Sequence, residues 1–334
     1  MTALSVLNPN LMDVARATDP NGQIASIVEI LNQTQEILDD MTWVTGNLPT
    51  GHQTTVRAGI PAPTWRKLYG GVQPNKSVNV KVTDNTGMLE AYAEIDKELA
   101  DLNGNTAQFR LTEDMAHIEG MAQEMASTIF YGNEGTEPEA FTGLSPRYNS
   151  LSASNAENII VGGGAGNDNG SIWLVVWGPR SLHGIVPKGS TAGLKVEDKG
   201  QVTIEDASGG SNTGRMEAYR THYIWKGGLT VRDWRYAVRI PNIDKSLLTK
   251  DASSGADLCD LMFQAMEKIP NLEAGRPVFY MSRDMRSFVR RQATNKTANS
   301  TLTIENVGGK RLMSFHGVPM KRCDALASDE TLVS

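Results

Sequence analysis

The chain has 334 residues, a formal net charge of −6, 40% hydrophobic residues and 21% charged residues. These values exclude a globally disordered chain, and the mild acidity argues against a dedicated nucleic-acid binder, which carries a basic field. Two cysteines, Cys259 and Cys323, are too few for a disulfide framework, and we expect both to be buried thiols. No run of about 18 apolar residues predicts a membrane span. Met1–Asn10 lacks the basic and apolar regions of a signal peptide, so we expect folding in a cytoplasm.

The first predicted element is a helix that begins at Asp19-Pro20, an N-cap followed by proline at the first helical position. Its apolar stripe recurs at spacings of three and four residues, through Ile24, Ile27, Leu31, Thr34, Leu38 and Met41. Such a stripe has no core of its own and must dock on another surface. Residues 1–41 therefore read as an arm.

Residues 42–87 lose the helical period. Glycines and prolines interrupt them, and short alternating runs such as Val78–Val82 predict strands. Because few aliphatic side chains are available to bury, we expect a long extended hairpin that projects from the body and is stabilised by neighbours. In a monomer such an extension is an entropic liability, whereas in an assembly it interlocks subunits.

Two helices are predicted next. The stripe of the first consists of Met88, Tyr92, Ile95, Leu99 and Leu102, and Asn103-Gly104 ends it. The second is a long helix over residues 112–131, with Thr112 as N-cap and a length of roughly 30 Å. Its stripe consists of Met115, Ile118, Ala122, Met125 and Ile129.

The remainder is a mixture of strands and helices. Strands are expected over residues 158–161, 171–177, 201–206, 216–226, 229–240 and 277–281, with Gly227-Gly228 as a two-residue hairpin turn. Helices are expected over residues 258–269 and, capped by Ser282, over residues 283–293. A strand pair should surround Gly308-Gly309. The fold class is therefore α+β.

The glycine run from Gly162 to Gly170 is the strongest candidate for chemistry. As a dinucleotide fingerprint it fails, because the third glycine comes one residue late and a strand follows instead of a helix. As a calcium-binding β-roll repeat, with Gly163, Gly164, Gly166 and Asp168, it is a single copy of a unit that needs stacking. We expect a flexible hairpin tip.

Other potential sites lack the required spacing. The five histidines show no metal-ligand pattern: His52, His117, His183, His222 and His316. Ser181 near His183 and Ser314 near His316 have no nucleophile elbow. The acid pairs Asp39-Asp40 and Glu113-Asp114 fit solvated positions. We therefore predict no enzyme, and no catalytic, cofactor-binding or metal-binding residue.

One basic cluster consists of Arg283, Arg286, Arg290, Arg291 and Lys296. The first three share a helix face. Two interpretations stay open: contact with phosphate or a partner's acids, or a solvated face.

The order of an arm, a long extended loop, a long helix and a mixed lobe resembles the Hong Kong 97-like (Johnson) fold of tailed-phage major capsid proteins. The closest resemblance is to podophages related to the Bordetella tropism-switching phage. It is carried by Glu94–Asn105 with Arg110 and Glu113-Asp114, Glu119-Gly120-Met121, Phe130–Asn133, Phe141–Leu144, Pro146–Asn149, Tyr223–Pro241, and Val278–Arg283 with Gly317-Val318-Pro319.

The resemblance implies an N-terminal arm over residues 1–41 and an extended E-loop over residues 42–87. It also implies a peripheral domain over residues 88–150 with its spine helix at 112–131, and an axial domain over residues 151–334 whose strands return to the peripheral domain. The implied function is self-assembly, as hexamers and pentamers, into the icosahedral shell around a double-stranded DNA genome.

The partners implied are further copies of the chain, a cement or decoration protein, a portal, a separate scaffolding protein and the packaged DNA, but no membrane. The location is the virion capsid, assembled in the host cytoplasm. Lys67 and Lys76 lie in the E-loop region, but nothing identifies a partner asparagine, so we predict no cross-linking. Two alternatives remain: an encapsulin-type compartment, and an enzyme using the loop at residues 162–170.

Overall fold

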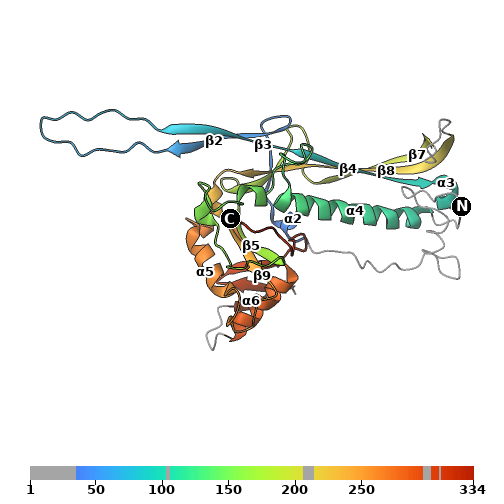
Figure 1. Cartoon of the computed structure of the whole chain (residues 1–334). Helices are drawn as coiled ribbons and strands as arrows, with labels where there is room; N and C mark the ends of the chain where they lie inside the picture. Colours follow the sequence, from blue (N-terminus) through green and yellow to red (C-terminus); the bar gives the residue numbers. More distant parts are fainter. Residues whose placement is uncertain (1–34, 103–105, 206–213, 296–301, 308–309) are drawn as a thin grey trace. The chain divides into compact units, whose positions relative to one another are not determined.

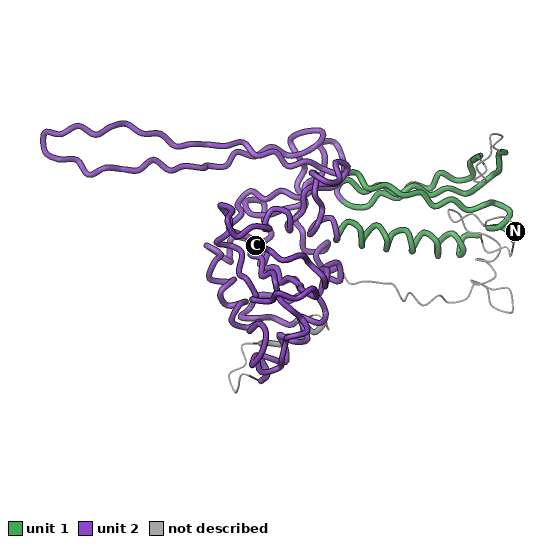
Figure 2. Tube along the Cα trace, in the orientation of Figure 1, with its two compact units in different colours: residues 1–33, 88–125, 193–226 green, residues 34–87, 126–192, 227–334 purple. Residues whose placement is uncertain are grey.

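The computed structural model describes residues 35–102, 106–205, 214–295, 302–307 and 310–334 (Figure 1). The chain divides into two compact units, each built from segments that are far apart in the sequence (Figure 2). Unit 1 comprises residues 1–33, 88–125 and 193–226, and unit 2 comprises residues 34–87, 126–192 and 227–334. The predicted helix that begins at Asp19 lies mostly outside the described residues.

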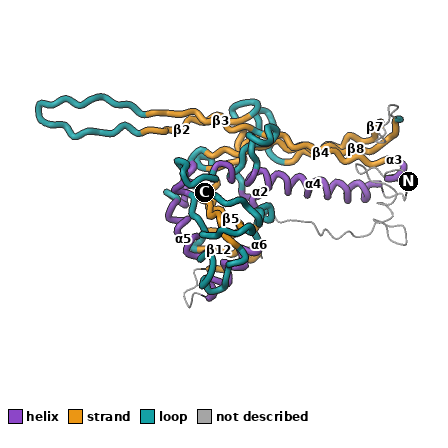
Figure 3. The backbone as a smooth tube through the Cα atoms, viewed as in Figure 1, coloured by secondary structure: helices purple, strands orange, loops and turns teal. Residues whose placement is uncertain are grey.

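The elements are a mixture of helices and strands, as the α+β prediction requires (Figure 3). The helices are α2 (Ile37–Asp40), α3 (Lys97–Asp101), α4 (Thr106–Tyr131), α5 (Leu258–Lys268) and α6 (Arg283–Asn295). The strands are β1 (Trp43–Thr45), β2 (Gly51–Gly59), β3 (Val78–Asn85), β4 (Gly87–Asp96), β5 (Asn169–Trp177), β6 (Leu182–Val186), β7 (Leu194–Glu205), β8 (Arg215–Val231), β9 (Ala237–Asp244), β10 (Arg276–Met281), β11 (Leu302–Val307), β12 (Lys310–Phe315) and β13 (Val318–Arg322). Among the residues that the structure describes, no helix is both long and apolar enough to cross a membrane.

The extended hairpin belongs to unit 2 and is confirmed. Strands β2 and β3 pair antiparallel from Gly51↔Asn85 to Gly59↔Val78 and form a separate two-stranded sheet. Residues 60–77 join them, and the hairpin extends away from the rest of unit 2 (Figure 2). The short strand β1, which precedes it, pairs in parallel with β6.

The predicted helix from Met88 to Leu102 is wrong. Most of this segment is strand β4, and the helix α3 occupies only its end, where the Asp96 side chain accepts a hydrogen bond from the Glu98 amide at 2.8 Å. Burial alternates along β4, because Ala93 and Ile95 are buried whereas Met88 and Tyr92 are exposed. This is the period of two of a strand with one buried face.

The long helix is confirmed, but it begins at Thr106 rather than at Thr112. Thr112 is an internal residue whose hydroxyl donates a hydrogen bond to the Gln108 carbonyl at 3.0 Å, so it does not cap the helix. The predicted buried stripe is only partly correct. Met115 and Ile118 are 54% and 39% exposed, and the buried face consists of Phe109, Met121, Met125, Ala126, Ile129 and Phe130.

The predicted hairpin turn at Gly227-Gly228 is also wrong, because β8 continues through both glycines to Val231. A Cβ at Gly228 would lie 2.6 Å from the Asn85 carbonyl oxygen, so a glycine is needed there for close approach of two backbones. A short 3₁₀ turn at Trp234–Tyr236 leads instead into β9.

The core of unit 2 surrounds β5, whose nine residues are all buried. This strand pairs with β9 and β10, and the order continues from β10 through β13 and β12 to β11. The predicted strand at residues 277–281, the helices at 258–269 and 283–293, and the strand pair around residues 308–309 are confirmed as β10, α5, α6 and β11–β12. Residues 158–161, predicted as a strand, contain only an isolated bridge from Ile159 to Arg239.

Unit 1 contains the neighbouring strands β4, β8 and β7, of which β7 and β8 are antiparallel. Strand β8 pairs with β7 from Leu194↔Trp225 to Glu205↔Arg215 and lies beside β4. Residues 193–226 group with residues 88–125.

Candidate assembly surfaces

The glycine run from Gly162 to Gly170 packs along strand β9. The Gly162 amide donates to the Pro241 carbonyl at 2.9 Å, and the Gly164 amide donates to the Asn242 carbonyl at 2.7 Å. A Cβ at Gly164 would lie 2.6 Å from the Asp244 amide nitrogen. The glycines therefore permit close packing of two backbones. The prediction of a flexible hairpin tip is wrong for this part of the loop.

The serines and histidines do not form catalytic pairs. The Ser181 hydroxyl donates to the Val176 carbonyl at 2.7 Å, and His183 contacts His52 edge to face, with ring centroids 5.9 Å apart. Burial, followed by His52 and Arg232, lowers the pKa of His183 to about 4. His316 lies in the turn between β12 and β13 with its ring against Phe263. Within the described residues, no group of three His, Cys, Asp or Glu residues could hold a metal ion.

One acid of each pair, Asp40 and Asp114, differs from the solvated acid that we predicted, whereas Asp39 is exposed. Asp40 is 4% exposed and accepts hydrogen bonds from Tyr280 at 2.8 Å and from Lys321 at 2.6 Å. It therefore ties α2 to the sheet of unit 2, and its assignment as a solvated acid is wrong. In unit 1, Asp114 accepts a hydrogen bond from the Tyr223 hydroxyl; after burial, this contact is the next cause that raises the pKa of Tyr223.

A buried polar network, which the sequence did not predict, holds the C-terminal segment of unit 2. Arg239 and Glu330 form an ion pair at 2.8 Å with side chains that are 3% and 4% exposed. Glu330 also accepts hydrogen bonds from Tyr131 and Ser171, and Arg239 donates to the Tyr148 carbonyl at 2.9 Å. The final residues are therefore an integral part of unit 2.

The arginines of the basic cluster on α6 differ in their contacts. Arg283 binds Asp324 through two nitrogens, at 2.8 Å from Nε and 2.5 Å from Nη2. Arg290 and Arg291 are exposed instead and line a surface hollow of about 550 Å³ with Lys250, Ser287, Thr294 and Asn295. Lys296 lies outside the described residues. The two interpretations of the cluster, contact with phosphate or a partner's acids and a solvated face, therefore now concern Arg290 and Arg291.

The tip of the hairpin is the most exposed apolar surface of unit 2. Trp65, Leu68 and Tyr69 are 101%, 91% and 103% exposed. A turn closes the tip, with the Gly70 amide donating to the Lys67 carbonyl at 3.0 Å. Residues 51–83 carry five basic residues and no acidic one: Arg57, Arg66, Lys67, Lys76 and Lys81. Such a surface fits a partner that is apolar and acidic.

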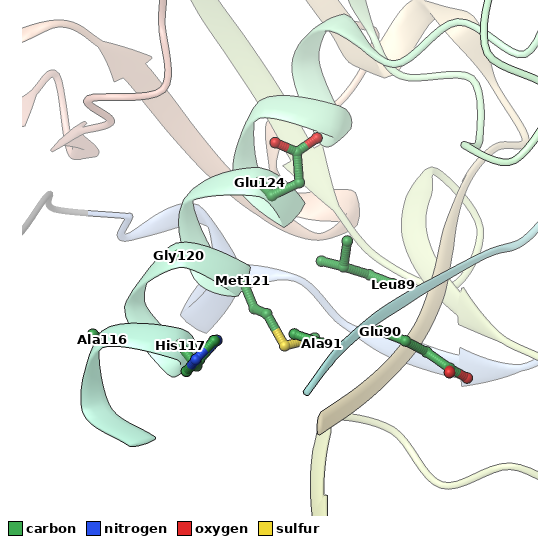
Figure 4. A pocket seen from close by; sticks show the side chains of 8 residues that line it. All are labelled: Leu89, Glu90, Ala91, Ala116, His117, Gly120, Met121 and Glu124. Atoms are coloured by element: carbon green, nitrogen blue, oxygen red, sulfur yellow. The ribbon is translucent and has the colours of Figure 1, made fainter. Parts of the chain in front are cut away.

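Unit 1 contains a complementary feature between β4 and α4. A hollow of about 340 Å³ is lined by Leu89, Glu90, Ala91, Ala116, His117, Gly120, Met121 and Glu124 (Figure 4). Residues 88–125, which build it, carry nine acidic and two basic residues. The hollow was not foreseen from the sequence, because it depends on a strand where a helix was expected.

The sequence model of a family described as "Major capsid protein GP7" matches residues 19–334. A chain of the solved structure of bacteriophage Epsilon15 is 40% identical, with 100% of both chains covered and a TM-score of 0.77. The chain belongs to the major capsid protein GP7 family. It is a shell protein of a phage capsid, and its fold is the Hong Kong 97-like fold.

More distant solved structures also match this capsid protein. A bacteriophage JBD30 capsid chain is 9% identical over 90% of this chain and 95% of that one, with a TM-score of 0.48. A chain of the holo-SrpI encapsulin complex from Synechococcus elongatus is 10% identical over 72% and 96%, with a TM-score of 0.42. Both are too dissimilar to bear on function. A search of curated proteins gives no match.

Proposed function

We propose that this capsid protein assembles as hexamers and pentamers into an icosahedral shell around the double-stranded DNA of a tailed phage. The observation that carries this proposal is the 40% identity to the Epsilon15 chain over the full length of both chains. The motifs at Glu94–Asn105 and Phe141–Leu144 further support a relationship to podophages of the Bordetella tropism-switching group. The role is mechanical, and we propose no enzymatic activity.

We propose that residues 1–41 serve as the N-terminal arm, residues 42–87 as the E-loop, residues 88–150 as the peripheral domain and residues 151–334 as the axial domain. In this proposal the spine helix is α4, which runs from Thr106 to Tyr131. The grouping of residues 193–226 with 88–125 supports the proposal that these strands return to the peripheral domain.

The hairpin is proposed to lie over a neighbouring copy. A lone two-stranded hairpin is marginally stable in water, so β2 and β3 need contacts that their own sheet does not supply. The five basic residues of 51–83 complement the nine acidic residues of 88–125 in a second copy. Charges arranged in this way fix the orientation of neighbours and suppress wrong contacts.

The proposed partners beyond further copies are a cement or decoration protein, a portal, a separate scaffolding protein and the packaged DNA, with assembly in the host cytoplasm. The formal net charge of −6 is compatible with loose proximity to DNA rather than tight binding. The encapsulin-type alternative has less support, because the family match is to a phage capsid protein.

The test replaces residues 60–77 with Asn-Gly. Gly59 and Val78 are paired across the hairpin, so a two-residue turn can join them without disturbing the register. We expect the shortened chain to fold, with circular dichroism and a melting temperature like those of the intact chain. Electron microscopy should find shells or capsomers for the intact chain and none for the variant.

Normal shells from the shortened chain would remove the assembly role of the hairpin. A stable monomer of the intact chain at high protein concentration would contradict the proposed function itself.

A further inference from the structure

Three small residues, Gly120 and Ala116 on α4 and Ala91 on β4, contribute to the lining of the unit 1 hollow (Figure 4). A Cβ built at Gly120 meets no atom within 4 Å. Met121, which is buried, and Leu89 supply the apolar surface. At about 340 Å³ the hollow lies at the lower end of the range of ligand pockets and has room for one large side chain.

We propose that this hollow receives Trp65 from the hairpin tip of a second copy. Trp65 is fully exposed, so its indole is not packed against its own chain. Tryptophan combines a large apolar area with few rotatable bonds, and it is enriched among the residues that contribute most to interfaces. Leu68 and Tyr69, which are equally exposed, would cover the margin of the hollow.

Charge favours this hollow over the one on α6. Arg66 and Lys67 follow Trp65 directly, and Glu90 and Glu124 line the unit 1 hollow. The α6 hollow is lined by Lys250, Arg290 and Arg291, which would repel the two cations of the tip. Each copy then offers one tip and one hollow, which is a head-to-tail contact of the kind that closes rings.

This inference rests on the proposed shell function, and the first experiment separates the two. The variant Thr64→Cys/Ala116→Cys keeps Trp65 and Gly120 and places exposed thiols beside the tip and at the hollow. Both native cysteines are buried, so background labelling is low. Assembled particles are treated with a short bis-maleimide and separated on a denaturing gel. The matched control is Thr64→Cys/Ser287→Cys, which places the second thiol at the α6 hollow.

We expect a ladder of covalent oligomers from the first variant and monomers from the control. Particles without a ladder, or equal ladders from both variants, would overturn the assignment of the hollow while leaving the shell function intact. Failure of the unaltered chain to assemble would overturn both.

A second experiment measures the energetic coupling between Trp65 and Gly120 in assembly. Trp65→Ala removes the anchor, and Gly120→Leu fills the hollow with a better helix former, so the melting temperature of the unassembled chain should not fall. Each change should raise the critical concentration for assembly by about tenfold or more. The double variant should be no worse than the poorer single variant, because both remove the same contact. Fully additive effects, or no effect of either single change, would contradict the proposal.

Discussion

At the scale of single residues, Arg239 and Glu330 link strand β9 to the C-terminal segment of unit 2. Both side chains are buried, and the guanidinium also lies 5.2 Å from the ring of Trp173. Removal of one partner of such a pair leaves an uncompensated buried charge, which costs more than the pair itself contributes.

Arg239→Met should therefore lower the free energy of unfolding by about 3–5 kcal/mol, measured by urea denaturation of the unassembled chain. The matched control is Arg235→Met, which breaks the pair with Asp233 at an arginine side chain that is 55% exposed. That change should cost about 1 kcal/mol or less. Equal losses of unfolding free energy from the two variants would show that burial does not determine the contribution of the Arg239–Glu330 pair.

The lowered pKa of His183 predicts that the stability of the chain depends on pH. Its pKa in the folded chain is about 4, below the ordinary value of 6.5, because of burial and the nearby His52 and Arg232. Between these two pH values the unfolded chain binds a proton that the folded chain does not, so stability falls as the pH falls from about 6.5 toward 4.

Replacing His183 with Leu should reduce the stability loss between pH 7 and pH 5 by about 2 kcal/mol relative to the unaltered chain. Urea midpoints at the two pH values measure it. An identical loss in both proteins would mean that other groups carry the acid sensitivity.

At the scale of elements, sequence patterns predicted correctly those helices and strands whose formation depends on neighbouring residues in the chain. The apolar stripe and the Asp257 cap of α5 lie within a short window of sequence, as does the apolar run Ile172–Trp177 of β5, and both elements were predicted. Strand β4 was mistaken for a helix, because Met88, Tyr92 and Ile95 satisfy the helical period while the strand depends on β8 more than 100 residues later.

Contacts between residues far apart in the sequence also explain why the role of the two glycines of β8 and the hollow of unit 1 were not predicted. Gly227-Gly228 has the composition of a turn, but the requirement at Gly228 is close approach to Asn85, which only the folded chain reveals. The extended hairpin was predictable, since its glycines, prolines and alternating residues are consecutive. The hollow was not, because Leu89 and Gly120 meet only when β4 packs beside α4.

At the scale of the whole molecule, the hairpin and unit 1 would bring opposite charges to the proposed contact between copies. Residues 51–83 have five basic and no acidic residues, whereas residues 88–125 have nine acidic and two basic residues. Charges at a surface attract over about 10 Å at 0.1 M ionic strength but only about 3 Å at 1 M. Burial of Trp65, by contrast, is not weakened by sodium chloride.

Raising sodium chloride from about 0.05 M to about 0.5 M should therefore increase the critical concentration for assembly, measured by light scattering with particles counted by electron microscopy. Arg66→Gln/Lys67→Gln should assemble less readily at low salt and respond less to added salt, because the tip then carries two fewer cations. Trp65→Ala should keep the salt response and lose affinity at every concentration. Assembly that strengthens with salt, and to the same degree in all three proteins, would mean that apolar burial alone joins the copies.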